Sequence, residues 1–290
     1  MRNSYAGIAA QTSLEFDLTL SEPVSGGDSN DAHRLTTTDG QNYFLKTNKP
    51  EMAFMFAAEQ AGLQALARAE QLRVPTTIAT GSSDEHAWLL MEWLDLTPGN
   101  ASAGRHLGRA LAELHQVRAE QFGFDTDNTI GCTRQFNGWS SDWAEFFCQC
   151  RLLPQLERAM SNGAPESLQR DMEKLLSRVD QWFTDYAPQP SLLHGDLWGG
   201  NWAMLSNNQP VVFDPAAYFG DREADIAMTY LFGGFPAEFY VAYEAAWPLD
   251  AGAQNRRPLY NLYHVLNHYN LFGGSYLVQA DRIIAELLAT

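Results

Sequence analysis

Apolar and polar residues alternate in the first part of the chain, which predicts β-strands there. Residues 14–20 read LEFDLTL, the pattern of a half-buried strand. Further strands are expected over 33–38 and 43–46, joined by an Asp-Gly turn. A stretch rich in Gly, Ser and Asn at 23–30 separates the first two strands. The chain therefore opens as an antiparallel meander with a glycine turn.

Helical composition follows this meander. Residues 52–69 are rich in Ala, Leu, Met, Glu and Gln, which are strong helix formers, and Pro75 ends the run. An apolar strand is expected at 87–92, and residues 94–105 are the most linker-like stretch of the chain.

Beyond this linker the spacing of apolar residues is mostly helical. Helices are expected over 105–118, 142–160, 167–186 and 256–289, with short strands near 192–194 and 210–213. The pattern predicts an α+β chain with two domains. Residues 1–93 form a lobe built on an antiparallel sheet, and residues 94–290 form a mainly helical lobe.

Composition narrows the function classes. A net charge of −16 over 290 residues argues against nucleic acid as a partner, because phosphate backbones select basic faces. An acidic balance is typical of plain solubility, or of a preference for cationic ligands. Three cysteines provide no disulfide framework, and no apolar run approaches the roughly 18 residues that a membrane span needs. We therefore expect a cytoplasmic protein with no membrane partner.

The strongest chemical signal is HGDLWGGN at residues 194–201. Asp196, followed five positions later by Asn201, matches the catalytic loop of protein kinases, where the Asp accepts the proton of the acceptor hydroxyl and the Asn helps to hold Mg²⁺. An apolar strand at 211–213 then delivers Asp214 at its end, where it can share the metal. A lone Asp in a glycine-rich loop is usually a turn former. The two motifs together predict Asp196 as the base and Asn201 and Asp214 as Mg²⁺ ligands.

The N-terminal half supplies the expected partners of an ATP site. Lys46 ends a strand and can reach the α- and β-phosphates, and Glu59 on the next helix can pair with it. Glu51 is a rival for that pairing, but it follows Pro50 at the helix start, where a carboxylate is favoured by the helix dipole alone.

Two further segments are expected to bind the nucleotide. Gly26 and Gly27 lie in a weak phosphate-loop signal that lacks the full G-x-G-x-x-G spacing, and a plain hairpin turn is the alternative interpretation. Glu92 and Leu94 belong to a hinge, MEWL, whose backbone groups would bind adenine. The linker after this segment agrees with a hinge between two lobes.

With these residues in view, the chain resembles bacterial fructosamine kinases (ketosamine-3-kinases), within the aminoglycoside phosphotransferase and choline kinase-like group. The narrowest similarities are Trp198 within HGDLWGGN and the run FDPAAYFGDREADIAM at 213–228. Residues 122–131 and 135–139 are also similar. The resemblance implies a bilobal protein-kinase-like fold. It also implies transfer of the ATP γ-phosphate to the 3-hydroxyl of a ketosamine, free or protein-bound, in support of deglycation.

The resemblance also implies roles for residues beside the motifs. Asp225 resembles a buried Asp that braces the catalytic loop. Trp198 and Tyr218 could stack on the sugar, although a scaffold role is equally compatible with their positions.

Three rival functions stay open at this point. A protein kinase would need an activation segment ending in a motif like A-P-E, which does not follow Asp214. An aminoglycoside or choline kinase would share the machinery, and its cationic substrates suit the acidic balance equally well. A nucleotide-binding pseudokinase is the third. The residues leave open which ketosamine is used and whether the chain oligomerises.

Overall fold

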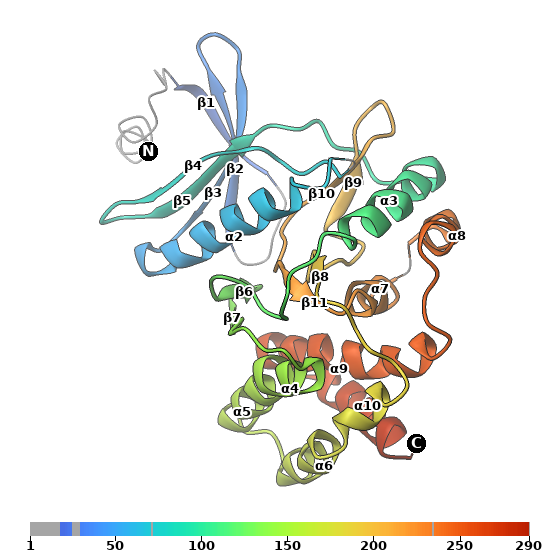
Figure 1. The fold of residues 1–290 in the computed structure, drawn as a ribbon. Coiled ribbons are helices and arrows are strands. Elements are labelled where there is room, and N and C mark those ends of the chain that lie inside the picture. Colours follow the sequence, from blue (N-terminus) through green and yellow to red (C-terminus); the bar gives the residue numbers. More distant parts are fainter. Residues whose placement is uncertain (1–17, 25–29, 71, 234, 290) are drawn as a thin grey trace.

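In the computed structural model of this chain, the described residues are 18–24, 30–70, 72–233 and 235–289. The N-terminal part is a five-stranded antiparallel sheet in the order β1-β2-β3-β5-β4, with helix α2 against it (Figure 1). The elements are β1 (Leu18–Pro23), β2 (Asp31–Thr37), β3 (Asn42–Asn48), a 3₁₀ turn η1 (Pro50–Met52), α2 (Ala53–Leu66), β4 (Thr77–Ser82) and β5 (Ala87–Glu92).

The meander predicted at the N-terminus is present, with different strand limits. Residues 14–17 of the first predicted strand lie outside the described residues. The Asp-Gly turn joins β2 to β3, and Gly40 takes the left-handed φ of 82° that favours glycine at such a position. β4 was not predicted, because its sequence TIATGS lacks apolar alternation. Pairing of its backbone with β5 makes it a strand.

The rest of the chain is mostly helical, and it packs below the sheet as drawn in Figure 1. Its helices are α3 (Ala101–Leu114), α4 (Trp143–Phe147), the π-turn η2 (Cys148–Leu152), α5 (Leu153–Ser161), α6 (Glu166–Leu176), the 3₁₀ turn η3 (Val179–Phe183), α7 (Glu223–Thr229), α8 (Ala237–Ala246), α9 (Ala253–Phe272) and α10 (Ser275–Ala289).

The rest of the chain also contains three short antiparallel pairs. They are β6 (Asn128–Ile130) with β7 (Thr133–Gln135), β8 (Ser191–Leu193) with β11 (Tyr218–Gly220), and β9 (Trp202–Met204) with β10 (Pro210–Val212). The 194–201 loop, which runs from His194 to Asn201, joins β8 to β9. Asp214 lies two residues after β10, so the β9–β10 hairpin brings both chemical motifs to one place.

Two helix limits differ from the sequence-based expectation for local reasons. α3 begins inside the stretch predicted as a linker, because the Asn100 side chain caps it and accepts a hydrogen bond from the Ala103 N–H at 2.9 Å. The helix expected over 256–289 is two helices, because Gly273 and Gly274 have φ values of 66° and 62° that interrupt it.

A shared apolar core joins the sheet to the helical part. One buried cluster contains Leu66 of α2 and Met91 of β5 together with Leu107 of α3, Val212 of β10 and Phe239 of α8. Burial of these side chains fixes the sheet and α2 above the short hairpins. Within the described residues, no helix combines the length and apolar character that crossing a bilayer requires.

Candidate active site

The 194–201 loop is held in shape from below by Asp225 of α7. Its two carboxylate oxygens accept hydrogen bonds from the backbone N–H groups of His194 (2.7 Å) and Gly195 (2.8 Å). Gly195 has a φ of 81°, and a Cβ atom there would lie 2.1 Å from the Ala216 carbonyl oxygen. The turn therefore requires glycine. A buried carboxylate fixes the loop, as the resemblance to fructosamine kinases implied for Asp225.

Asp225 is itself positioned by a buried histidine that sequence reasoning missed. Nε2 of His115 on α3 lies 3.2 Å from Asp225, and its Nδ1 lies 2.8 Å from the hydroxyl of Tyr243 on α8. Burial lowers the pKa of His115 and keeps its ring neutral at pH 7. Burial opposes the charge of Asp225, but hydrogen bonds from His115 and Gly195 hold its pKa below the usual value. The brace is therefore an ionised carboxylate.

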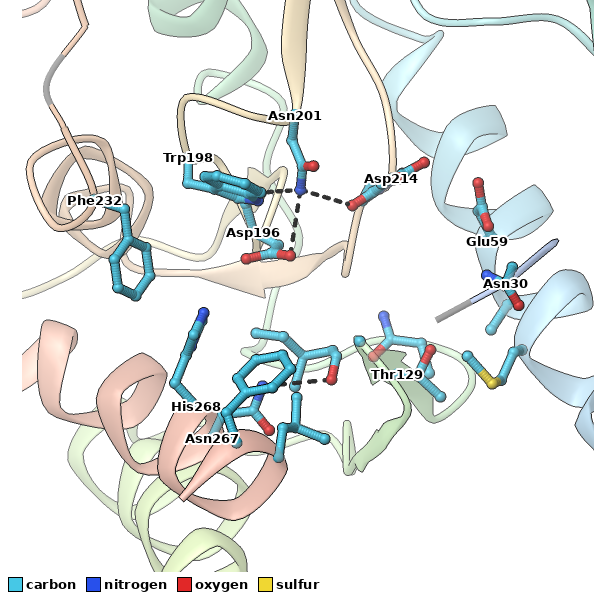
Figure 2. A pocket seen from close by; sticks show the side chains of 18 of the residues that line it. Asn30, Glu59, Thr129, Asp196, Trp198, Asn201, Asp214, Phe232, Asn267 and His268 are labelled. Atoms are coloured by element: carbon cyan, nitrogen blue, oxygen red, sulfur yellow. Dashed lines mark hydrogen bonds between the residues drawn. The ribbon is translucent and has the colours of Figure 1, made fainter. Parts of the chain in front are cut away.

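Asn201 connects the two aspartates of the predicted site. Its Nδ2 donates to the backbone oxygen of Asp196 at 2.8 Å, to the Asp196 carboxylate at 3.3 Å and to the backbone oxygen of Asp214 at 3.5 Å (Figure 2). These contacts use the amide nitrogen, so the amide oxygen is the atom that remains for a ligand. Asp214 has a φ of 58°, an uncommon backbone conformation for a residue other than glycine.

Lys46 joins this cluster from the sheet. Its Nζ lies 2.7 Å from the carboxylate of Glu59 on α2 and 2.5 Å from that of Asp214. Burial opposes the charge of Lys46, but the Asp214 and Glu59 carboxylates raise its pKa above the usual value. Glu51, the rival partner, is exposed in η1. The Lys46 ammonium group is therefore held in place beside Asp214, the aspartate predicted to bind Mg²⁺.

Asp196 has an acidity that its surroundings alter strongly. Burial raises its pKa to about 7, and the negative charge of Asp214 adds to the shift. A carboxylate poised near neutrality can accept a proton and be recycled at physiological pH.

Two cavities adjoin at these residues. The strand cavity, about 480 Å³, is lined by β3, β5 and the segment after β5, including Phe44, Met91, Leu94 and Leu96. The helix cavity, about 380 Å³, is lined by α2, β6, α9 and α10 together with Asp196. Both are lined by the same four side chains, which are Lys46, Trp198, Asn201 and Asp214.

The predicted hinge residues lie at the strand cavity. Leu94 lines it, and so does Glu92, whose carboxylate is engaged with Arg73 at 2.6 Å. That side chain is occupied by structure, and the backbone N–H of Glu92 donates to the Thr76 carbonyl oxygen at 3.0 Å, so the group that remains for a ligand is the backbone carbonyl. Gly26 and Gly27 of the predicted phosphate loop lie outside the described residues.

The two aromatic residues proposed to stack on sugar have different locations. Trp198 is 39% exposed and lines both cavities. The expectation that Tyr218 could contact sugar is wrong in this structure, because its ring is buried under the Arg151 guanidinium, 3.9 Å from the ring centre, and stacks on Phe146. Tyr218 therefore belongs to the scaffold.

The far wall of the helix cavity was missed by sequence reasoning. It consists of aromatic and imidazole rings from the segment after α7, from α9 and from α10 (Figure 2), namely Phe232, His268, Phe272 and Tyr276. Their spacing on α9 and α10 is helical, but nothing local to the sequence indicates which helix face meets the 194–201 loop.

His268 has a defined tautomer in this wall. Its Nδ1 lies 2.8 Å from the His264 carbonyl oxygen, and since a carbonyl only accepts, Nδ1 carries the proton. Burial lowers the pKa of His268, so the neutral ring presents Nε2 as a hydrogen-bond acceptor.

The donor set suits a cation that is shared with a ligand. Among the described residues, no group of three or more His, Cys, Asp or Glu side chains could hold a metal by itself. Mg²⁺ commonly takes one or two protein oxygens and completes its shell with substrate phosphates and water. The Asp214 carboxylate and the Asn201 amide oxygen fit that requirement.

Comparisons with known proteins agree with this geometry. The family model for fructosamine kinase matches residues 1–290. A probable ketoamine kinase of Synechocystis is 44% identical over 97% of this chain and 94% of its own length. A protein from Haemophilus somnus named as a "putative fructosamine-3-kinase" has a structure that superposes with a TM-score of 0.88 at 30% identity, covering 98% of this chain and 96% of that one.

A more distant likeness supports the fold alone. An ADP-bound aminoglycoside phosphotransferase superposes with a TM-score of 0.63 at 16% identity, over 99% of this chain and 96% of that one. The α+β, protein-kinase-like fold expected from the sequence is therefore confirmed.

Proposed function

The chain belongs to the fructosamine kinase family, and from that premise we propose that it transfers the γ-phosphate of ATP to the 3-hydroxyl of a ketosamine. The observation that carries the proposal is the junction of two cavities. Lys46, Asn201 and Asp214 line both, whereas Asp196 lines only the helix cavity. A phosphoryl group at this junction would have its donor on one side and the acceptor hydroxyl, beside Asp196, on the other.

The strand cavity is the proposed nucleotide side. Its apolar wall suits an adenine ring, and the backbone of Glu92 and Leu94 would supply hydrogen bonds to the base. Lys46, fixed by Glu59, would neutralise phosphate oxygens, and Gly26 and Gly27 would cover them with backbone N–H groups. On this assignment residues 1–93 are the nucleotide-binding lobe and residues 94–290 the catalytic and substrate lobe.

Asp214 and Asn201 are the proposed ligands of Mg²⁺, through the carboxylate and the amide oxygen. When bound, Mg²⁺ supplies neutralisation of the charge that the phosphate oxygens carry. Asp225 contributes indirectly, because it fixes the backbone from which Asp196 projects.

The helix cavity is the proposed acceptor side. Asp196 would orient the sugar hydroxyl and accept its proton as the new P–O bond forms and the bond from the γ-phosphorus to the bridging oxygen of ADP breaks, so that ADP leaves. A ketosamine carries a basic amine, and carboxylates together with aromatic faces such as Trp198 favour a cation. Phosphorylation of the sugar makes the adduct labile, so we assign the chain to deglycation, and to the cytoplasm, where ATP is available.

A substrate screen tests this function. We expect ATP consumption with fructoselysine and ribuloselysine that exceeds, by at least about 100-fold in kcat/KM, the consumption with aminoglycosides or choline. The Asp196→Asn protein serves as the blank for contaminating kinases. Turnover of an aminoglycoside or choline, with none of the ketosamines, would overturn the assignment.

A pair of exposed apolar side chains tests which cavity holds which substrate. Phe272 lines only the helix cavity and Leu96 only the strand cavity. Each side chain is partly exposed, so its truncation to Ala should have little effect on stability. Because apolar contact is lost, the truncation is expected to weaken the binding of one substrate by roughly 3- to 10-fold.

The two variants are expected to behave as opposites in steady-state kinetics. Phe272→Ala raises the KM for the ketosamine and leaves that for ATP unchanged, and Leu96→Ala does the reverse. Each variant is thus the control for the other, and a rise in the same KM in both would contradict the assignment of the cavities.

A further inference from the structure

A third cavity lies at the opposite ends of β8 and β11 from the 194–201 loop. This basal cavity has a volume of about 210 Å³ and is lined by Arg118, Tyr186, Ser191, Asp221, Arg222 and Trp247, with Ala187 and Gln189. It shares no lining residue with the strand or helix cavity. The proposed kinase reaction makes no use of it.

Two guanidinium groups meet on one indole ring in the basal cavity. The Arg222 guanidinium carbon lies 3.9 Å from the ring centre of Trp247 and that of Arg118 lies 5.4 Å from it. Within the part of the chain that the structure describes, neither arginine forms an ion pair with an acidic side chain. Two positive charges therefore converge on this cavity, and Asp221 is the one carboxylate among its lining residues.

Arg222 keeps donors available after its contacts with the protein. Its guanidinium donates to the carbonyl oxygens of Trp247 and Pro248 and to the Tyr243 hydroxyl. Three of its five N–H groups are thereby used, which leaves two. Arg118 is exposed, so its guanidinium can turn toward a ligand at the mouth of the cavity.

Ser191 supplies a buried donor with no partner. The residue is 1% exposed, and within the described residues its hydroxyl has no hydrogen-bond partner. A buried hydroxyl left unsatisfied costs about 1–3 kcal/mol, so its presence in a cavity wall calls for a polar occupant.

Asp221, the carboxylate in this wall, is occupied by hydrogen-bond donors of the protein, among them the backbone N–H of Glu223 at 3.0 Å. Its oxygens accept hydrogen bonds from the hydroxyls of Tyr186 at 2.9 Å and Tyr260 at 2.5 Å. Burial raises the pKa of Asp221 to about 7, with help from the charge of Glu223, so part of the population is neutral at pH 7.

The basal cavity is connected to the 194–201 loop by two routes. Ser191 begins β8, which leads directly into His194. Arg222 also donates to the Tyr243 hydroxyl at 3.1 Å, and this hydroxyl bonds to His115, the partner of Asp225. An occupant that holds Ser191 and Arg222 would therefore restrain both supports of the loop.

We propose that the basal cavity is a binding site for a small phosphate-type oxyanion, and that its occupation stabilises the 194–201 loop. Two guanidinium groups and a hydroxyl favour a dianion over a monocarboxylate. The volume admits inorganic phosphate or a small phosphate ester, but not a nucleotide.

Inorganic phosphate is the probe for this site. The protein is first saturated with a non-hydrolysable ATP analogue and Mg²⁺, so that phosphate cannot act at the nucleotide site. Thermal unfolding and amide hydrogen exchange are then followed as phosphate is added at constant ionic strength, with chloride and acetate as matched anions. We expect a saturable rise in Tm and slower exchange in the peptide that contains the amides of His194 and Gly195.

Variants locate the effect. Arg118→Gln removes an exposed charge and should fold normally, yet it is expected to weaken phosphate binding by about tenfold or more. Ser191→Ala is expected to weaken it as well. Arg170→Gln, an exposed arginine on α6 that lines none of these cavities, is the charge-matched control and should respond as the unmodified protein does.

Each remaining outcome would overturn part or all of the proposal. No saturable rise in Tm, an equal rise with chloride or acetate, or an unchanged response in Arg118→Gln would eliminate the site. Binding without slower exchange at His194 and Gly195 would eliminate its link to the loop. None of these readouts depends on turnover. The phosphate site can therefore be refuted while the kinase assignment stands, and the kinase assignment can be refuted while the phosphate site stands.

Discussion

Replacement of Asp196 by Asn is expected to lower kcat by about 10²–10⁴-fold while the affinity for ATP changes little. Asp196 lines the helix cavity and not the strand cavity, so its carboxylate faces the acceptor and not the nucleotide. An Asn side chain keeps the size and can still accept the hydrogen bond that Asn201 donates, but it cannot take up the proton of the sugar hydroxyl. Steady-state kinetics and nucleotide titration measure the two quantities separately.

The pH profile provides the specific signature of this role. The base must be ionised, and the pKa of Asp196 is about 7, so kcat/KM of the unmodified protein should rise as pH increases through that value. This limb should disappear from the residual activity of Asp196→Asn. Asp84→Asn, an exposed carboxylate in the β4–β5 turn, is the control and should retain both rate and profile. Turnover retained in Asp196→Asn would refute the assignment.

The site residues that the sequence predicts are those that lie near one another along the chain. The 194–201 loop and Asp214 are separated by a single hairpin, so their spacing in the sequence is enough to predict that they lie close together. The pair of Lys46 and Glu59 follows from a strand and the next helix. The structure places these side chains in direct contact. The roles of these side chains in phosphoryl transfer are proposals.

The parts of the site that depend on packing between distant segments are not predicted by the sequence. His268 and Phe272 reach the helix cavity only because α9 packs beneath the 194–201 loop, and Asn128 reaches it through β6. The sequence left the role of Tyr218 open for the same reason. An aromatic beside a catalytic motif can face the cavity or the core, and here the buried Arg151 holds it in the core.

Replacement of Lys46 by Met is expected to destabilise the protein by about 3–5 kcal/mol, as well as weaken ATP binding. Met has a similar length and fills the same space, but it leaves the Glu59 and Asp214 carboxylates facing each other with no cation between them. Urea unfolding measures the change in stability. Lys49→Met, which removes an exposed lysine just after β3, is the matched control and should stay within about 0.5 kcal/mol of the unmodified protein.

The loss of stability in Lys46→Met should depend on pH in a defined direction. Burial and the charge of Asp214 both raise the pKa of Glu59, and the Lys46 ammonium, which opposes them, is absent in the variant. A carboxyl group whose pKa is higher in the folded than in the unfolded state favours folding at low pH, and that contribution is lost as the pH rises through the folded-state value. The stability of the variant should therefore be closest to that of the unmodified protein in acid and fall further below it toward neutrality.

A second substitution tests the same cause. Adding Glu59→Gln to Lys46→Met removes one of the two facing charges and should restore part of the stability at pH 7. If Lys46→Met unfolds like Lys49→Met at every pH, the buried ammonium does not hold this cluster together.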